Sequence, residues 1–319
     1  KGDNVSYATD NHGQAWAWGS GVSGALGDNG TANKSTPVAV CGSHTFCEIS
    51  GGTNYGIALD NNGILWSWGA GVGGGLGNNS ESNQLTPVAV CGGHTFCKIA
   101  TGLVTSYALK ANGELWAWGN SYYGSVGYNL ITNKCTPVAV CGDHTFCEIS
   151  SGNYSAGAID NYGMAWTWGL NSSCELGDST LTSRRTPVAV CGDHTFVKLS
   201  SHKHVLALKE SGELWAWGDD TYAQIGNDTV AARAPSPVSV CGFHNFCKIL
   251  AVGSTSYAID NNNDAWTWGS NVYGQAGRGT TAIVSYTEPV PVHYDPISWS
   301  SSSKSSSSSS LSSSSSCLS

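Results

Sequence analysis

Short apolar runs and turn residues alternate along this chain with a period of about fifty residues. One unit begins with the apolar run Ser106–Leu109, turns at Ala111-Asn112-Gly113 and continues as Leu115–Gly119, in which large and small side chains alternate. A Gly-rich stretch leads to Pro137–Val140, and a tight loop then leads to Phe146–Ser150. These runs are short, rich in β-branched and aromatic residues and bounded by Gly, Asn, Asp or Pro. The pattern predicts four short β-strands per unit, joined first by an Asn-Gly hairpin turn, and no helices.

The unit recurs six times, and its most regular feature is a Trp-x-Trp-Gly motif. The motif occurs at Trp16/Trp18, Trp66/Trp68, Trp116/Trp118, Trp166/Trp168, Trp215/Trp217 and Trp266/Trp268. Four short antiparallel strands per unit, repeated at this spacing, are typical of a β-propeller. The sequence therefore predicts an all-β propeller of six blades.

The two ends of the chain indicate how the ring would close. The chain opens on the first strand of a unit, Ser6–Thr9, with no fourth strand before it. It closes with the third strand Pro289–Val292 and a degenerate fourth strand, Pro296–Trp299. We expect this last strand to complete the first blade, because closure removes an exposed sheet edge. Residues 1–297 are then the propeller, and residues 298–319 are a Ser-rich tail or linker.

Three motifs of the unit resemble those of a known family. Gly-x-x-Trp-x-Trp-Gly is followed by Asn-x-x-Gly-x-x-Gly and then by Pro-Val, with the best match at Ala265–Gly277. This unit resembles the repeat of the regulator of chromosome condensation (RCC1-like) propellers, from Val5 to about residue 292. The resemblance implies the propeller fold, for which seven blades are the family norm. It implies little about function, because members include a nuclear exchange factor, a plant photoreceptor and a secreted inhibitor.

Charge and hydropathy exclude two classes of partner. Charged residues make up 11% of the chain, the net charge is −8, and no basic cluster exceeds the pair Arg184-Arg185. Because nucleic-acid binding needs a basic stripe, we expect no nucleic-acid partner. No apolar run approaches the ~20 residues of a membrane span. The chain begins at Lys1, and we expect any export signal to have been removed already.

Cysteines flank the loop between the third and fourth strands in the motif Cys-Gly-x-His-Thr-Phe-Cys, with Asn for Thr in the last complete copy. The complete pairs are Cys41/Cys47, Cys91/Cys97, Cys141/Cys147 and Cys241/Cys247. If the flanking strands form a hairpin, each pair lies within disulfide reach, and twelve cysteines then indicate an oxidising compartment. Metal ligation and inert buried thiols are the alternatives. Cys135 and Cys174 occur in consecutive variable loops, and we expect them to bridge neighbouring blades.

Nothing in the repeats indicates an active site or a cofactor. The His of each loop recurs by repetition, which favours a role in stabilising the turn over catalysis. The Gly-rich loops follow a strand but open no helix, so they lack the geometry that cradles phosphate. Asp60–Gly63 lacks the spaced acidic ligands of a calcium loop. We therefore expect a protein that is not an enzyme and has no cofactor and no metal.

The loops after Trp-x-Trp-Gly, called the variable loops below, differ strongly from copy to copy, whereas the loops at the other ends of the strands are nearly identical. Loops on a rigid scaffold commonly carry binding residues. The candidates on this face are Tyr122, Tyr123, Tyr128, Tyr222 and Tyr273. The same face carries most Asn-x-Ser/Thr triplets, and the glycosylation candidates are Asn4, Asn29, Asn33, Asn78, Asn153, Asn171 and Asn227.

These features predict an extracellular or cell-surface protein. The leading hypothesis is a structural or adhesive module, a subunit of a surface filament whose Ser-rich connector carries O-linked glycans. The alternative is a soluble secreted protein that binds or inhibits a partner through its variable loops. In both cases the partner is a protein, either another protein or a further copy of this chain, with glycans as possible decoration. The unpaired Cys191 and Cys317 suggest that the tail contacts another chain.

Overall fold

The computed structural model describes residues 4–242, 244–279, 281 and 285–292. In this part of the chain the secondary structure is β-strand apart from two short 3-10 turns, η1 (Val22–Gly24) and η2 (Val72–Gly74). The strands are β1 (Val5–Thr9), β2 (Ala15–Gly19), β3 (Lys34–Ala39), β4 (Phe46–Gly52), β5 (Tyr55–Asp60), β6 (Leu65–Gly69), β7 (Gln84–Ala89), β8 (Lys98–Thr101), β9 (Thr105–Leu109), β10 (Leu115–Gly119), β11 (Lys134–Ala139), β12 (Phe146–Ser151), β13 (Ser155–Asp160), β14 (Ala165–Gly169), β15 (Arg184–Ala189), β16 (Lys198–Ser201), β17 (His204–Leu208), β18 (Leu214–Asp219), β19 (Arg233–Ser239), β20 (Phe246–Val252), β21 (Thr255–Asp260), β22 (Ala265–Ser270) and β23 (Ser285–Pro291).

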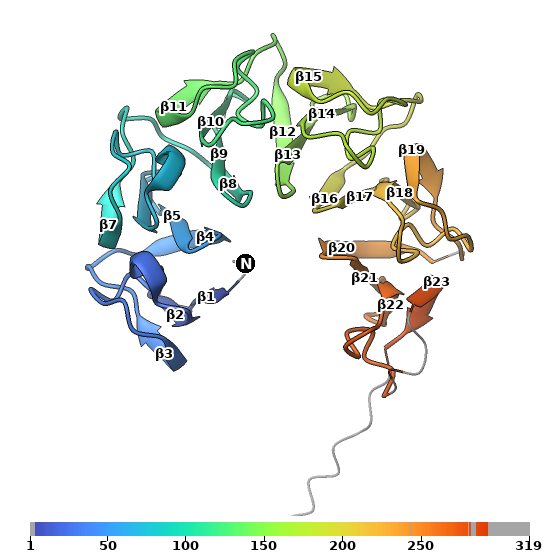
Figure 1. The fold of residues 1–319 in the computed structure, drawn as a ribbon, viewed down its shortest axis with the longest axis horizontal. Coiled ribbons are helices and arrows are strands. Elements are labelled where there is room, and N and C mark those ends of the chain that lie inside the picture. Colours follow the sequence, from blue (N-terminus) through green and yellow to red (C-terminus); the bar gives the residue numbers. More distant parts are fainter. Residues whose placement is uncertain (1–3, 243, 280, 282–284, 293–319) are drawn as a thin grey trace, which may run out of the picture.

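The strands form six antiparallel sheets, which confirms the predicted count of six blades. Five sheets have four strands, in orders such as β4-β5-β6-β7, and the first has the three strands β1-β2-β3. Figure 1 shows the sheets arranged around a central axis, with β4, β8, β12, β16 and β20 innermost. They form an arc whose ends, the sheets of β1–β3 and β20–β23, lie apart. The predicted closure by Pro296–Trp299 lies outside the described residues.

Each four-stranded sheet begins with the last strand of one sequence unit and continues with the first three strands of the next. The third and fourth strands of a unit therefore lie in different sheets, as β3 and β4 do. The connecting loop passes beneath the hairpin of the preceding sheet, where the Phe46 N–H donates to Gly13 O (2.8 Å). The assignment of strands to sheets decides which of the residues that flank the connecting loops can pair with each other.

An aspartate shapes the hairpin between the first two strands of a unit. Asp60 Oδ1 accepts the N–H groups of Asn62 (2.8 Å) and Ile64 (3.0 Å), and Asp60 O accepts the Gly63 N–H (3.0 Å). Gly63 alone of these turn residues has a positive φ, +79°. The turn is thus a three-residue hairpin loop with glycine in the left-handed position, rather than the two-residue Asn-Gly turn that we predicted.

The core lies between consecutive sheets and is dominated by the second Trp of each motif. Trp68, Trp118, Trp168, Trp217 and Trp268 are all completely buried. Trp118 packs against the preceding sheet, and its indole N–H donates to Gly75 O (2.9 Å). Tryptophans thus pack between consecutive sheets, and glycine is required at Gly77, where a Cβ would lie 2.6 Å from Trp118 Nε1.

Candidate functional site

The variable loops share one face with the turns that join the innermost strand of each sheet to the next strand. The Ala70 N–H in a variable loop donates to Asn54 O in such a turn (2.9 Å), and Ser20 and Asn120 do the same with Asn4 and Val104. This confirms the predicted division of the loops into two faces. We call this side of the arc the variable face.

The tyrosines predicted to bind a partner occupy different positions on the variable face. Tyr122 and Tyr273 are 68% and 89% exposed, and Tyr222 is 41% exposed. Tyr123 packs edge-on against Tyr122, with ring centroids 4.7 Å apart, and also contacts Tyr154. Tyr128 is held within its own loop by a short hydrogen bond to Thr132 O. Of the five tyrosines, Tyr122, Tyr222 and Tyr273 are therefore the most exposed to solvent.

Aliphatic residues that the sequence analysis did not single out accompany these tyrosines. The variable loops of three adjacent sheets expose Leu130 (53%), Ile131 (50%), Leu181 (55%) and Val230 (62%). The loops between β10 and β11, β14 and β15, and β18 and β19 thus each expose apolar side chains, called the apolar tips here. The variation of these loops between copies could have indicated the aliphatic residues, but the sequence prediction included only the tyrosines.

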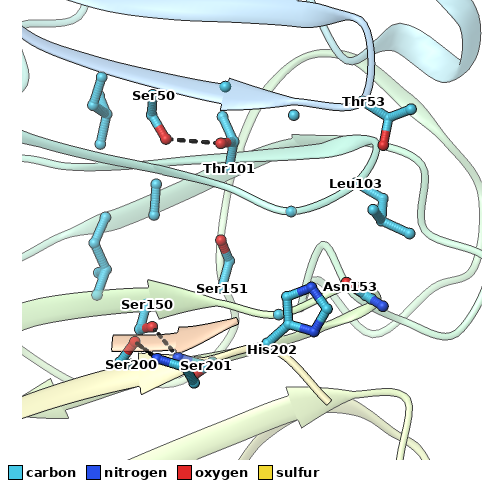
Figure 2. Close-up of a pocket in the computed structure, with 18 of the residues that line it drawn as sticks. Ser50, Thr53, Thr101, Leu103, Ser150, Ser151, Asn153, Ser200, Ser201 and His202 are labelled. Atoms are coloured by element: carbon cyan, nitrogen blue, oxygen red, sulfur yellow. Dashed lines mark hydrogen bonds between the residues drawn. The ribbon is translucent and has the colours of Figure 1, made fainter. Parts of the chain in front are cut away.

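A cavity of about 230 Å³ lies on the central axis, between the innermost strands. Its wall carries hydroxyl groups at equivalent places in successive strands, as Figure 2 shows. Ser50 Oγ lies 2.7 Å from Thr101 Oγ1, Ser150 Oγ accepts the Ser201 N–H (2.9 Å), and Ser200 Oγ accepts the Ala251 N–H (2.9 Å). These bonds join the inner strands of neighbouring sheets. They connect the second sheet to the third, the fourth to the fifth and the fifth to the sixth.

The wall of this cavity is polar but uncharged. Among the described residues that line it, His202 is the one ionisable side chain. The Ser201 hydroxyl is buried in the wall and has no hydrogen-bond partner within the described ranges. Asn153, Leu103 and Thr53 lie in the turns at the variable face, so the cavity is bounded by these turns on that side (Figure 2).

A second cavity of about 260 Å³ shares Asn153 and His202 with the first and extends to a variable loop. It is lined by Glu175 and Asp219 as well as by Lys203, so its charges are mixed. Burial, with a smaller contribution from the charge of Asp219, raises the pKa of Glu175.

Glu175 accepts a hydrogen bond from a backbone N–H in its variable loop, and a glutamine does the same in two other repeats. Its Oε2 accepts the Ser173 N–H (2.7 Å). Gln224 Oε1 accepts the Tyr222 N–H (2.8 Å), and Gln275 accepts from Tyr273 in the same way. The bond needs only an acceptor, so the negative charge of Glu175 is not required for the loop.

The face opposite the variable face is built from a repeated stack. His44 lies on Trp66 with ring centroids 3.8 Å apart, and Trp66 Nε1–H donates to Asp60 Oδ2 (3.2 Å). The equivalent stacks are His94–Trp116, His144–Trp166, His194–Trp215 and His244–Trp266. The loop histidines therefore serve packing, through their rings rather than through the turn hydrogen bonds that we expected.

Two of these stacks replace the aspartate with lysine. The ammonium groups of Lys110 and Lys209 lie 4.5 and 4.7 Å from the ring centroids of Trp116 and Trp215. Burial, followed by the charge of the nearby lysine, lowers the pKa of both His94 and His194. Lysine therefore favours neutral histidine in these two stacks.

The predicted hairpin disulfides are wrong. Cys41, Cys47, Cys91, Cys97, Cys141, Cys147, Cys241 and Cys247 are all free thiols. Cys41 follows β3 of the first sheet whereas Cys47 lies in β4 of the second, so no hairpin brings the two together. Cys47 is the extra residue of a bulge, between the pairs Phe46↔Asp60 and Glu48↔Leu59, and its thiol contacts Leu59 O (3.4 Å).

The predicted bridge between Cys135 and Cys174 is also wrong, since both thiols are free. The two cysteines lie at different boundaries between sheets. Cys135 in β11 lies against Gly74 of the preceding sheet, where a Cβ on the glycine would be 2.8 Å from Cys135 Cα. Cys174 faces the following sheet, from which Arg233 contributes to its electrostatic environment. Cys191 is free as well, with Ser179 Oγ 3.3 Å from its sulfur, and Cys317 lies outside the described residues.

The environment of one predicted glycosylation site, Asn171, argues against a glycan. Asn171 is completely buried, and its Nδ2 donates to Asp178 Oδ1 (3.0 Å) and Thr180 O (3.0 Å), so no sugar can reach it. Asn33 Oδ1 accepts the Gly21 N–H (3.0 Å) and fixes its own loop. The remaining triplets, at Asn4, Asn29, Asn78, Asn153 and Asn227, carry no feature that distinguishes them as acceptors.

In the described part of the chain, no group of three or more His, Cys, Asp or Glu side chains could hold a metal ion. No helix among the described residues is long and apolar enough to cross a membrane.

Comparison with known proteins identifies the class of protein. The family model of the RCC1-like domain matches residues 1–311. The chain therefore belongs to the RCC1-like domain family, as the repeat motifs indicated.

Solved structures share the fold. Human WBSCR16 superposes with a TM-score of 0.80 at 16% identity, covering 92% of this chain and 80% of that one. Prp20p from Saccharomyces cerevisiae also gives a TM-score of 0.80, at 22% identity, covering 93% of this chain and 76% of that one. Its structure is described together with its binding to Gsp1p and histones, and another structure has yeast RCC1 (Prp20) bound to Kap60.

Sequence relatives match short segments only. Human E3 ubiquitin-protein ligase HERC2 is 30% identical over 79 residues, which are 24% of this chain and 2% of that protein. A zebrafish (Danio rerio) RCC2 homolog is 30% identical over 95 residues, 29% of this chain and 19% of that protein. The chain thus spans a small part of the length of these relatives.

These relationships overturn the predicted extracellular filament. The proteins that this chain resembles include Prp20p, whose structure is described with its binding to Gsp1p and histones, and a ubiquitin ligase. The expectations of a filament subunit, a secreted inhibitor, an extracellular or cell-surface location, glycosylation and disulfides were therefore wrong. The oxidising compartment was inferred from the cysteine pairs, and those are free thiols. The propeller fold and the RCC1-like repeat are the features that the comparisons support.

Proposed function

We propose that residues 1–297 form a propeller that works by binding a protein through its variable face, without catalysis. The observation that carries this proposal is the exposure of the apolar tips on that face. Tyr122, Leu130, Leu181 and Val230 are each more than half exposed, and all belong to variable loops of three adjacent sheets. Exposed apolar patches on a soluble domain commonly mark sites of protein interaction.

The chemistry of this face suits a protein rather than a catalytic site. Aromatic side chains rimmed by polar groups are typical of the centres of protein interfaces. Binding of Gsp1p, histones and Kap60 by Prp20p is consistent with a protein partner, although likeness at 22% identity extends only to the fold. Residues on the opposite face are engaged in the His–Trp stacks and are therefore less available.

The proposal is tested by comparing variants of the two faces. Full-length chain and a variant carrying Tyr122→Ser and Leu181→Ser are used for quantitative affinity purification from the same cells. The control is Tyr162→Ser, which removes an 84% exposed tyrosine from a hairpin on the opposite face.

We expect partners recovered with the wild-type chain to be lost with the first variant and retained with the control. Alanine-type truncation of central aromatic residues at interfaces costs about 2 kcal/mol or more, which is a clear loss in such an assay. If both variants recover the same proteins in the same amounts as the wild-type chain, the variable face is not the binding surface.

A further inference from the structure

The cavity on the central axis is a second feature of the molecule, separate from the apolar tips of the variable loops. We propose that it is a binding site for an uncharged peptide turn, supplied by the protein that docks on the variable face. This inference rests on the proposed function, because the turns that bound the cavity, at Thr53, Leu103 and Asn153, belong to that face.

The hydrogen-bonding capacity of the wall defines the ligand as polar. Ser150 and Ser200 use their oxygens as acceptors for backbone N–H groups of the next sheet, and a hydroxyl that accepts still has a hydrogen to donate. The buried Ser201 hydroxyl has no partner among the residues that the structure describes. Ala100 stands where Ser50, Ser150 and Ser200 stand, so residue 100 supplies no hydroxyl to the neighbouring strand at Ser151.

The same wall defines the ligand as uncharged. No Asp, Glu, Lys or Arg is among the described residues that line the cavity. An ionised group placed there would lose hydration without gaining an opposite charge. Neutral groups that both donate and accept hydrogen bonds can match serine and threonine hydroxyls without this cost.

The backbone around the axis favours a peptide over a small polyol. The inner strands β4, β8, β12, β16 and β20 each lie at the edge of their sheet. Edge strands present N–H and C=O groups, and these recruit polypeptide backbone. Ile149 and Leu250 add an apolar patch, and Leu250 is 47% exposed.

The volume sets the length of the inserted segment. A cavity of about 230 Å³ has the volume of roughly eight water molecules in the liquid. It is smaller than the cavities that hold drug-sized molecules, about 300–1,000 Å³. A turn of a few small residues fits, whereas a helix or a folded domain does not.

The test uses a defined probe and the full chain. N-acetyl-Gly-Asn-Gly amide is neutral, and N-acetyl-Gly-Asp-Gly amide has nearly the same shape with a negative charge. Each is titrated into labelled protein while backbone amide resonances are followed by NMR. We expect the neutral peptide to saturate and to shift amides of Thr101, Ser151 and Ser201, and the charged peptide and glucose to shift them little.

Two variants and one control complete the experiment. The double change Ser151→Val and Ser201→Val should weaken binding about tenfold, as expected for the loss of two hydrogen bonds. Ala100→Leu should block the cavity by volume alone, so the test does not depend on one variant remaining folded. Ser43→Val, in an exposed loop of the opposite face, should bind like the wild-type chain.

Three results would overturn the assignment. These are the absence of saturable shifts at the axis, equal binding of the charged peptide or of glucose, and undiminished binding to both cavity variants. Because the probe needs no partner, its failure leaves the capture experiment on the variable face intact. Conversely, probe binding together with unchanged capture by the face variants would contradict the proposed function alone.

Discussion

Replacing Trp118 and Trp18 by alanine separately tests whether contact between sheets stabilises this fold. Both residues are the second Trp of their motif. Trp118 is completely buried against the preceding sheet and donates to Gly75 O (2.9 Å). Trp18 is only partly buried, since it lies in the first sheet, at one end of the arc. The chain therefore contains its own control for the effect of enclosure.

The magnitudes follow from what each substitution leaves behind. Trp118→Ala opens a cavity between two packed sheets, and such changes cost about 3–5 kcal/mol. Gly75 O still accepts the Ser106 hydroxyl (2.9 Å), so no backbone carbonyl is orphaned and the cost is mainly packing. Trp18→Ala removes a side chain that is partly solvated already and encloses no cavity, so we expect a loss of about 1–2 kcal/mol.

Urea unfolding followed by far-ultraviolet circular dichroism measures both losses, and hydrogen exchange shows whether sheets unfold separately. The second measurement is needed because repeat proteins can lose cooperativity. Trp118→Phe is the matched variant that keeps an aromatic ring but removes the N–H, and it should cost less than alanine. Equal destabilisation by Trp18→Ala and Trp118→Ala would refute the reasoning, because enclosure between sheets would then contribute nothing.

Three further changes test local features. Gly77→Ala should lower the free energy of unfolding by more than about 3 kcal/mol, and Gly93→Ala should lower it by about 1–2 kcal/mol, as measured from urea midpoints. Both glycines have a positive φ, but only at Gly77 would a Cβ meet an indole nitrogen, at 2.6 Å. Burial raises the folded-state pKa of Glu175, so its ionised form destabilises the fold as the pH rises through that pKa. Glu175→Gln should therefore stabilise the protein at pH 7 but not below about pH 4. An equal gain in stability at both pH values would contradict this. Ala100→Ser should add about 0.5–1.5 kcal/mol to the free energy of unfolding and slow hydrogen exchange of the Ser151 amide. The reason is that the new serine would supply the hydroxyl that three other inner strands have. Unchanged exchange of the Ser151 amide would argue against this link.

The repeat made the fold predictable because its signals are local. Strand length, turn residues and the Trp spacing all depend on neighbours within one unit, so the six-sheet arrangement could be deduced. Grouping into sheets was harder, since each sheet draws its inner strand from the preceding unit. The cysteine prediction failed at this step. Cys41 and Cys47 are six residues apart in sequence, yet Cys41 follows a strand of the first sheet and Cys47 lies in a strand of the second.

The candidate site was only partly predictable. Variation among the loops indicated the correct face, and Tyr122 and Tyr273 are exposed there. Sequence could not show which polar residues are consumed by the loops themselves. Asn171 has an acceptor triplet, but it is completely buried and holds its loop together. The axial cavity was missed altogether, because its wall combines Ser and Thr residues from four units.

The contrast between the two faces supports the functional argument on its own. On the face opposite the variable face, each recurring residue has a structural partner in its own or the neighbouring repeat, as His44 has Trp66 and Trp66 has Asp60. Substitution there would disturb packing, so the copies remain alike. On the variable face the loops need only a few residues for their shape, such as Asn33, whose Oδ1 holds the Gly21 N–H. The remaining positions are free of that constraint, and large apolar side chains at such solvent-exposed positions are best explained by a partner that covers them.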